Sequence, residues 1–331
     1  MNVQSFSHEL QIALKIAREA AELAESVRVE LVRPSMIKTD RSPVTVADFA
    51  VQALVSARLE KEIPKDSLVG EEDTAELRKS ENNSVFEQVR KYLRPFLPEA
   101  DLEAIYAWID RGGGAAKGRY WVLDPVDGTK GFLRGEQYAV ALALIENGVV
   151  KLGVLACPNL RESRFADVGG VGTLAFAEKG KGAWQTSLKK EGPLCPLKVS
   201  SCADPSQSVL LRSSDESHMN VEKTENLLKT LKVTKPPVEM SSLAKHAVLA
   251  SGGADFFLRL LPPKNPNYRE KIWDQAPGLV IIQEAGGLLT DSNGKALDFN
   301  HGRELVENRG LLGANPHLHP QILSALQRDS S

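Results

Sequence analysis

The sequence predicts a layered α/β protein, and three observations support this fold class. Apolar residues recur at helical spacing over residues 6–32, which indicates a long amphipathic helix. Two apolar runs at 138–145 and 149–156 are joined by an Asn-Gly turn, which is typical of a β-hairpin. Beyond residue 208 strand and helix patterns alternate, as they do where helices cover a sheet.

The N-terminal third is expected to be mainly helical. The apolar stripe of the first helix consists of Leu10, Leu14, Ala17, Ala21, Ala24, Val27 and Leu31. Pro34 ends this helix, and a second helix is predicted at about 44–62, ending before Pro64. Residues 74–118 are polar and rich in charge, so we expect one or two surface helices followed by a flexible glycine-rich loop.

The next segment is expected to form strands. A short apolar run at 120–123 ends at Asp124. The hairpin turns at Glu146-Asn147-Gly148, because Asn and Gly accept the positive φ that a tight hairpin turn requires. Further strands are expected at 173–178 and 182–185.

Residues 187–208 are rich in proline and serine and mark the predicted domain boundary. We expect an N-terminal α+β domain at 1–195, which carries most of the candidate ligands, and a C-terminal α/β domain at 196–331, which contributes Asp274. The elements predicted in the second domain are strands at 208–211, 255–260 and 288–291, and helices at 221–231, at 243–251 and directly after Asp274.

The composition excludes several classes of protein. The chain has 331 residues, of which 42% are hydrophobic and 25% charged, so it can bury a core of its own. Its net charge of −2 offers no general attraction for nucleic acid or an anionic membrane, and no apolar run approaches the roughly 20 residues of a membrane span. The three cysteines, Cys157, Cys195 and Cys202, form no CxxC pair, which favours a reducing compartment. We therefore expect a cytoplasmic monomer that binds neither nucleic acid nor membrane; the nucleus and organelles stay open as locations.

The sharpest local signal is Trp121-Val122-Leu123-Asp124-Pro125-Val126-Asp127-Gly128-Thr129. A strand ends at Asp124, Pro125 fixes the turn, and Asp127 follows three residues later. Carboxylates placed in this way suit Mg²⁺, and a helix starting near Thr129 would direct free N–H groups at an anion. Read alone, the segment is better explained as an Asx turn between strand and helix.

Three further motifs also have simple structural explanations when each is read alone. Gly70-Glu71-Glu72-Asp73 reads as an exposed acidic loop, since adjacent carboxylates repel one another unless they are solvated or bind a metal. In Trp273-Asp274-Gln275-Ala276-Pro277-Gly278, Asp274 is placed as the N-cap of a helix. Ser42-Pro43-Val44-Thr45-Val46-Ala47-Asp48 reads as another capped helix start.

The order of these motifs points to a family. Gly70-Glu71-Glu72, then the DPVDGT segment at 124–129, then the WDQAPG segment at 273–278 resemble the inositol monophosphatase-like, lithium-sensitive phosphatase superfamily. The resemblance runs from about residue 6 to 325. It implies a layered α-β-α-β-α sandwich, hydrolysis of a phosphate monoester with two or three Mg²⁺ ions, and inhibition by Li⁺.

Within this superfamily, the flanking residues resemble the 3′(2′),5′-bisphosphate nucleotidases. Residues 42–48 match that group's SPVTVAD, and residues 129–135 match its TKGFLRG. The resemblance implies removal of the 3′-phosphate of adenosine 3′,5′-bisphosphate, with 3′-phosphoadenylyl sulfate open as a second substrate. Gln275 stands where the group commonly has His, and Pro277 is unusual there, which leaves fine substrate preference open.

The resemblance also implies roles for individual residues. The metal ligands would be Glu71, Asp124 and the Val126 carbonyl for one ion, and Asp124, Asp127 and Asp274 for a second. Asp48 and Thr129 would orient and polarise the nucleophilic water, because a threonine hydroxyl is not a strong base unaided.

The implied substrate contacts are Gly128, Thr129, His218, Ser242, Lys245, Arg259 and Asp274. Among these, Lys245 and Arg259 would hold the phosphate that is not cleaved, with the arginine able to bind it through two N–H groups. His218 would contact the base or the ribose.

Two alternatives stay open. An inositol phosphate phosphatase would use the same metal centre and would differ in the pocket for the leaving group. The other is a catalytically silent module that senses nucleotides or metal, although silent relatives usually lose metal ligands and this chain keeps every ligand named above.

Overall fold

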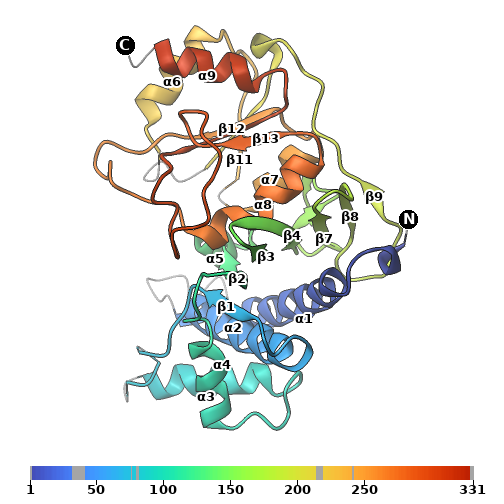
Figure 1. The fold of residues 1–331 in the computed structure, drawn as a ribbon. Helices are drawn as coiled ribbons and strands as arrows, with labels where there is room; N and C mark the ends of the chain where they lie inside the picture. Colours follow the sequence, from blue (N-terminus) through green and yellow to red (C-terminus); the bar gives the residue numbers. More distant parts are fainter. Residues whose placement is uncertain are drawn as a thin grey trace.

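The structure is a computed structural model that describes residues 2–31, 42–75, 77–79, 82–213, 219–240 and 242–328. Within these ranges the chain forms two main β-sheets with helices on the outer faces and between them (Figure 1).

The first sheet has seven strands in the order β1-β2-β3-β4-β7-β8-β9. Their bounds are β1 Ser67–Gly70, β2 Arg119–Asp127, β3 Ala139–Glu146, β4 Val149–Cys157, β7 Thr173–Glu178, β8 Ala183–Ser187 and β9 Cys195–Pro196. Strands β1 and β2 are parallel, whereas the other neighbouring pairs are antiparallel. The carboxyl ends of β1 and β2 therefore lie at the same edge of the sheet. Two short strands, β5 Leu160–Arg161 and β6 Phe165–Ala166, pair separately.

The second sheet has five strands in the order β11-β10-β12-β14-β13. Their bounds are β10 Leu210–Arg212, β11 Val238–Glu239, β12 Phe256–Arg259, β13 Leu288–Thr290 and β14 Leu311–Ala314. β10 is parallel to both of its neighbours, and β14 is antiparallel to both of its own.

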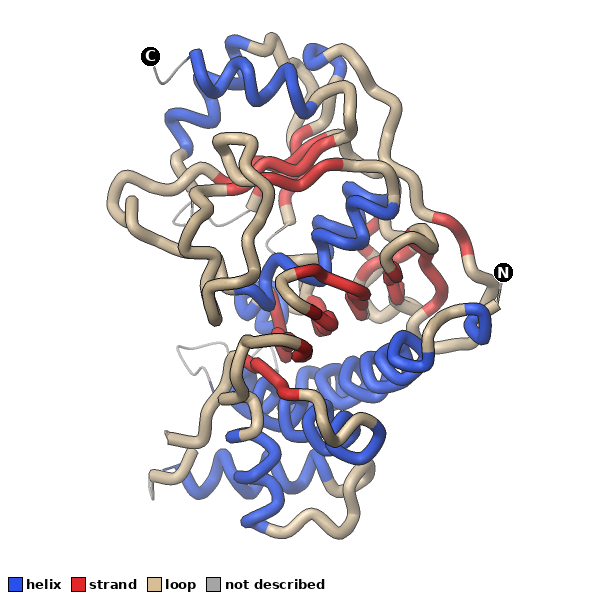
Figure 2. Tube along the Cα trace, in the orientation of Figure 1, coloured by secondary structure: helices blue, strands red, loops and turns tan. Residues whose placement is uncertain are grey.

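The helices complete five layers. Helices α1 (His8–Leu31) and α2 (Ser42–Glu62) pack on the first sheet, with α3 (Asn83–Leu93) and α4 (Leu102–Asp110) against α2. Helices α7 (Ala244–Ala250) and α8 (Ile272–Glu284) lie between the two sheets, and α6 (Val221–Thr230) and α9 (His319–Arg328) lie beyond the second. Figure 2 shows the same alternation of helices and strands. The α-β-α-β-α sandwich expected from the sequence is confirmed.

The first sheet is buried on both faces. Along β2, Trp121 and Leu123 belong to the core shared with α1 and α2, whereas Tyr120 and Val122 belong to the core shared with α7 and α8. Side chains of a strand alternate between its faces, so β2 contributes to two cores at once. A third core, which includes Leu227 and Phe256, lies on the outer side of the second sheet.

Several predicted elements agree with the structure, and the hairpin is the best defined. Asn147 and Gly148 have φ values of 50° and 74°, as the turn between β3 and β4 requires. The strand predicted at 120–123 instead runs on to Asp127, with a bulge between Asp124 and Asp127. Proline lacks the N–H that a regular ladder needs, so Pro125 explains the irregularity.

The loop predicted to be flexible before β2 is in fact bonded to the edge of β1. Gly70 N donates to Gly112 O at 2.9 Å, and Gly114 N donates to Leu68 O at 3.0 Å. A Cβ at Gly114 would lie only 2.5 Å from Leu68 O, so glycine permits this close approach.

The division into residues 1–195 and 196–331 stays a prediction. Strand β9 of the first sheet spans Cys195–Pro196, and the second sheet begins at Leu210. No helix in the described part of the chain is long and apolar enough to cross a membrane.

Candidate active site

Strand β2 carries two of the candidate ligands at its carboxyl end. Asp124 is only 4% exposed, and its Oδ1 has no hydrogen-bond partner among the described residues. The bulge separates Asp124 from Asp127, after which Gly128 adopts a left-handed φ of 89° and the short helix α5 (Thr129–Arg134) begins. A buried carboxylate oxygen without a donor is costly unless a ligand satisfies it.

The acidic loop lies beside this strand end. Gly70, the last residue of β1, is opposite Leu123 in the parallel ladder, so Glu71 follows next to Asp124. The buried side chain of Gln52 on α2 fixes the loop: its Oε1 accepts from Glu72 N at 3.0 Å, and its Nε2 donates to Glu72 O at 2.6 Å. The same Nε2 donates to Ile109 O at 2.8 Å. Three backbone groups thus hold Gln52 in place.

Helix α8 brings Asp274 to the same region, but not as the predicted N-cap. The cap residue is Lys271, and Asp274 lies in the first turn. The helix begins earlier because Ile272 and Trp273 are buried in the core between the sheets, and Ile272 N donates to Arg303 O at 3.1 Å. A carboxylate in the first turn still benefits from the positive end of the helix dipole.

The four predicted acidic ligands lie close enough to act on one another. Burial raises the pKa of Asp124 well above its usual range, and the charges of Glu71, Asp127, Asp274 and Asp48 raise it further. Burial likewise raises the pKa of Asp274, with added effects of Glu270, Asp127 and Glu71. Mutual repulsion of this kind is relieved when a cation binds between the groups.

Asp48, on helix α2, belongs to the same acidic group. It is 8% exposed, and burial followed by the charges of Glu72 and Glu71 raises its pKa well above the usual range. Burial and the neighbouring Glu71 and Asp73 raise the pKa of Glu72 to about 7. Thr129 is exposed at the start of α5, which contacts α2; the described contacts include no hydrogen bond between Thr129 and Asp48.

The donor set fits Mg²⁺. The carboxylates supply hard oxygen atoms only, which this cation prefers, and the unsatisfied oxygen of Asp124 is available to it. Among the described side chains, no three carboxyl, imidazole or thiol groups converge as they would around a bound ion.

Two cationic side chains, Lys245 and Arg259, lie within electrostatic reach of this acidic group. The Asp127 carboxylate accepts from Leu243 N and from the Ser242 hydroxyl, and it lies near the charges of Lys245 and Arg259. Burial lowers the pKa of Lys245, while Asp127 acts in the opposite direction. Three of the predicted substrate contacts are therefore near the acidic group; His218 lies outside the described residues.

Arg259 is held by a network that the sequence did not reveal. Its Nη1 forms an ion pair with Glu270 Oε2 at 3.0 Å, and its guanidinium lies 5.0 Å from the ring centroid of Tyr268. Gln275 Nε2 donates to the same Glu270 oxygen at 3.1 Å. The Nε of Arg259 has no hydrogen-bond partner among the described residues and can still donate to a ligand.

Comparisons with known proteins agree with this picture. Residues 3–331 match the model of the inositol monophosphatase family. A 3′(2′),5′-bisphosphate nucleotidase of Oryza sativa is 40% identical, with 97% of this chain and 94% of the relative covered. A 3′,5′-bisphosphate nucleotidase 2 of Arabidopsis thaliana is 39% identical, with 98% and 97% covered.

Solved structures share the fold at lower identity. Inositol monophosphatase-II of Staphylococcus aureus superposes with a TM-score of 0.65 at 20% identity, covering 98% of this chain and 97% of that one. Thermotoga maritima IMPase gives a TM-score of 0.62 at 22% identity, covering 97% and 98%.

Proposed function

Because the chain belongs to the inositol monophosphatase family, we propose that it is a Mg²⁺-dependent phosphatase that hydrolyses the 3′-phosphate of adenosine 3′,5′-bisphosphate to give AMP and phosphate. The observation that carries the proposal is the position of Asp127, which lies within electrostatic reach of the other acidic residues and of Lys245 and Arg259. An acidic group suits metal ions, and an adjacent cationic pair suits a second phosphate. The full-length relatives named as bisphosphate nucleotidases support the same substrate class.

In this proposal the metal ligands are Glu71, Asp124, the Val126 carbonyl, Asp127 and Asp274, which together would hold two or three Mg²⁺ ions. Bound Mg²⁺ would supply a water of lowered pKa and positive charge to neutralise the phosphate oxygens. The orphaned Oδ1 of Asp124 supports its role as the ligand shared between ions.

Asp48 and Thr129 are proposed to hold the attacking water. The Thr129 hydroxyl would donate its hydrogen to Asp48, which leaves its oxygen free to accept from the water and to orient it. Asp48 is buried on α2 and lies within electrostatic reach of Glu71 and Glu72, so its carboxyl is close to the proposed metal ligands. The contact between α2 and α5 supports the pairing.

The phosphate that is not cleaved is proposed to bind Lys245 and Arg259. Arg259 keeps one ion pair to Glu270 and has its Nε left over, so it can bind a phosphate without leaving its anchor. Further proposed contacts of the substrate are Gly128, Thr129, His218, Ser242 and Asp274. A cytoplasmic location and a monomeric state likewise stay predictions.

A substrate panel tests this function. With Mg²⁺, phosphate release from adenosine 3′,5′-bisphosphate should have a kcat/KM at least about tenfold above that for inositol 1-phosphate, because inositol 1-phosphate has no second phosphate for Lys245 and Arg259. The opposite ranking would assign the chain to the inositol phosphate phosphatases instead. Turnover of neither substrate would favour a silent binding module, and 3′-phosphoadenylyl sulfate in the panel shows whether a sulfated 5′-phosphate is accepted.

A further inference from the structure

Arg303 reaches from the C-terminal half of the chain to the strand that precedes Glu71. It lies in the long connection between β13 and β14, where its side chain is half-buried. Its Nη1 donates to Gly112 O at 3.1 Å, and its Nη2 donates to Gly70 O. Gly70 ends the edge strand β1, and Gly112 lies in the loop beside it, where Gly70 N also donates to Gly112 O.

The same guanidinium also contacts the residue directly before Asp274, the proposed ligand from the C-terminal half of the chain. It lies 4.8 Å from the ring centroid of Trp273, which directly precedes Asp274. Gly70 directly precedes Glu71, so one side chain contacts the neighbours of two proposed ligands that come from different layers of the fold. The backbone adds to this link, since Ile272 N donates to Arg303 O at 3.1 Å and Leu305 N donates to Glu270 O at 2.9 Å.

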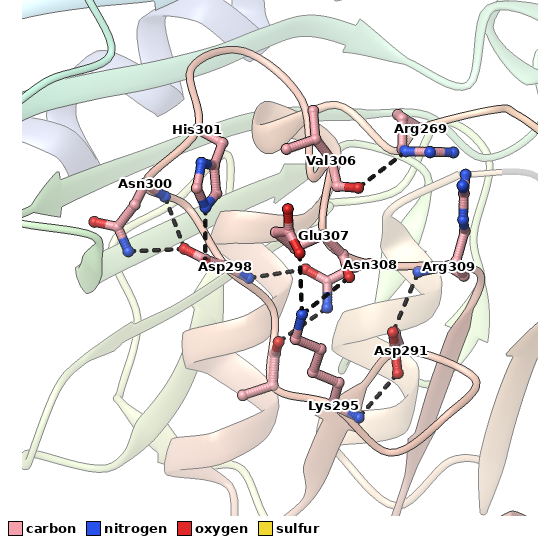
Figure 3. A network of polar contacts seen from close by, with 11 residues as sticks. Arg269, Asp291, Lys295, Asp298, Asn300, His301, Val306, Glu307, Asn308 and Arg309 are labelled. Carbon is pink, nitrogen blue, oxygen red and sulfur yellow. Dashed lines mark hydrogen bonds and ion pairs between the residues drawn. The ribbon is translucent and has the colours of Figure 1, made fainter.

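The connection that presents Arg303 is itself held in place at its base (Figure 3). Asp291 accepts from the backbone N–H groups of Lys295 and Arg309, one from each arm of the connection. Asn308 joins the arms again, accepting from Asp298 N at 2.9 Å and donating to Ala296 O at 2.9 Å.

The tip of the connection is anchored to the first sheet as well. Tyr120 on β2 donates its hydroxyl hydrogen to Phe299 O at 3.0 Å. Near the tip, Asp298 accepts from Asn300 N at 3.0 Å and forms a contact of 3.2 Å with His301. A connection fixed at both ends loses little further entropy when it positions an arginine.

The contacts of Arg303 require a guanidinium. A planar guanidinium can donate to two carbonyls at once while its face lies on an indole ring. An ammonium group is a compact point charge and has no flat face or fixed fork of donors to make both contacts together. The charge of Arg303 also acts on Glu71 and Asp73, which lie at the acidic end of the site.

We propose that Arg303 is a positioning residue that holds the Glu71 loop and the first turn of α8 at a fixed separation, so that ligands from both halves of the chain bind the same metal centre. This inference rests on the metal dependence in the proposed function. Removal of such outer contacts typically costs about 10–100-fold in metal affinity or activity.

Two variants test the proposal, Arg303→Lys and Arg303→Met. Lysine keeps the charge and loses the fork, whereas methionine keeps a stem that can pack on Trp273 and loses every donor. The matched control is Arg18→Lys. Arg18 is also part-buried and donates to two backbone carbonyls, Ser187 O and Leu188 O, but neither of these residues adjoins a proposed metal ligand. Because the two replacements differ in chemistry, the proposal can still be tested if only one of the two variants folds.

The first readout is calorimetric binding of Mg²⁺ without substrate, and the second is amide hydrogen exchange at residues 70–73. Both Arg303 variants should bind Mg²⁺ about tenfold more weakly and exchange faster in this loop. The KM for adenosine 3′,5′-bisphosphate at saturating Mg²⁺ should stay within about twofold. The Arg18 variant should bind Mg²⁺ as the wild type does.

Normal Mg²⁺ binding by a folded Arg303 variant would overturn the proposal, and so would an equal loss of Mg²⁺ affinity in the Arg18 control, since either result assigns Arg303 a purely structural role. Thermal unfolding without metal measures that structural contribution separately. A wild type that neither binds Mg²⁺ nor releases phosphate would instead contradict the proposed function, which keeps the two failures distinct.

Discussion

Gln52 and Glu72 form a reciprocal pair, in which the side-chain amide of Gln52 both accepts from the Glu72 N–H and donates to the Glu72 carbonyl, at 3.0 and 2.6 Å. The amide copies the two backbone hydrogen bonds that a neighbouring strand would offer. Gly70 leaves room for it, since a Cβ at Gly70 would lie 2.4 Å from Gln52 Oε1. The acidic loop thus depends on a helix residue far away in sequence.

Replacing Gln52 by Leu should destabilise the protein by about 2–4 kcal/mol. The substitution leaves the part-buried N–H and C=O of Glu72 and the buried carbonyl of Ile109 without this partner, at about 1–3 kcal/mol for each group that finds no water. Urea unfolding measures the loss. Gln207→Leu is the control, since Gln207 is exposed and its change should stay within about 0.5 kcal/mol; equal effects of the two variants would contradict the prediction.

Replacing Asp124 by Asn should abolish turnover and stabilise the metal-free protein. The change removes the most crowded carboxylate of the acidic group and its repulsion with Glu71, Asp127, Asp274 and Asp48. We expect activity to fall by more than about a hundredfold and the free energy of unfolding in EDTA to rise by about 1–2 kcal/mol. Retained activity together with lower stability would show that Asp124 has a structural role only.

Replacing Gly278 by Ala should cost about 1–3 kcal/mol, because helix α8 approaches α7 through this glycine. A Cβ there would lie 1.9 Å from His246 Nδ1. Adding His246→Ala should recover part of the loss by opening space for the methyl group. Gly192→Ala, where the nearest atom would be 3.5 Å away, serves as the control in the same unfolding measurement.

His246 should make the protein less stable at mildly acidic pH. It is fully buried, neither ring nitrogen has a hydrogen-bond partner among the described residues, and burial followed by the charge of Lys245 holds its pKa well below the usual value. The folded chain therefore keeps His246 neutral while the unfolded chain protonates it near pH 6.5. The contribution of neutral His246 to the free energy of unfolding is therefore fully present above about pH 7 and decreases as the pH falls.

The pH effect can be isolated with His246→Phe. The histidine ring lies 5.0 Å from the ring of Phe257, so a phenyl ring can take its place. Between pH 7.5 and 5.5 the wild type should lose about 1 kcal/mol more than the variant, since one protonation costs up to about 1.4 kcal/mol per pH unit. Identical pH profiles of the free energy of unfolding would contradict this assignment.

The three cysteines should differ in reactivity. Cys157 is buried, and burial raises the pKa of its thiol; Cys195 is exposed, and Cys202 is intermediate. Burial also raises the pKa of the Cys202 thiol, so titration of the folded protein with a disulfide reagent should modify Cys195 first, Cys202 more slowly and Cys157 only after unfolding. Rapid reaction of all three would mean that the core around β4 opens readily.

Local patterns predicted the parts of this fold that local forces determine. The stripe from Leu10 to Leu31 defines α1, and Asn147-Gly148 defines the β3–β4 turn, since in both cases neighbouring residues supply the signal. Strand β14 and helix α9 were not predicted. β14 has only four residues, and such short apolar runs carry little periodicity.

Non-local contacts explain what the sequence did not reveal about the site. The order of the acidic motifs indicated Glu71, Asp124, Asp127 and Asp274, and the structure places them within electrostatic reach of one another. Gln52, Glu270 and Arg303 carried no such signal, because their partners lie on other elements and neither spacing nor residue type specifies them. The N-cap assignment of Asp274 failed for the same reason: burial of Ile272 and Trp273, a tertiary effect, moved the start of the helix.

The layer of α7 and α8 between the two sheets has a consequence for biosynthesis. Glu71 leaves the ribosome about 200 residues before α8 and the connection that carries Arg303. Under the proposed assignment, a nascent chain can complete its first sheet and still lack Asp274, one of the five proposed metal ligands. Catalytic competence would then appear only after α8 has been synthesised, so that chains truncated before Asp274 would be inactive.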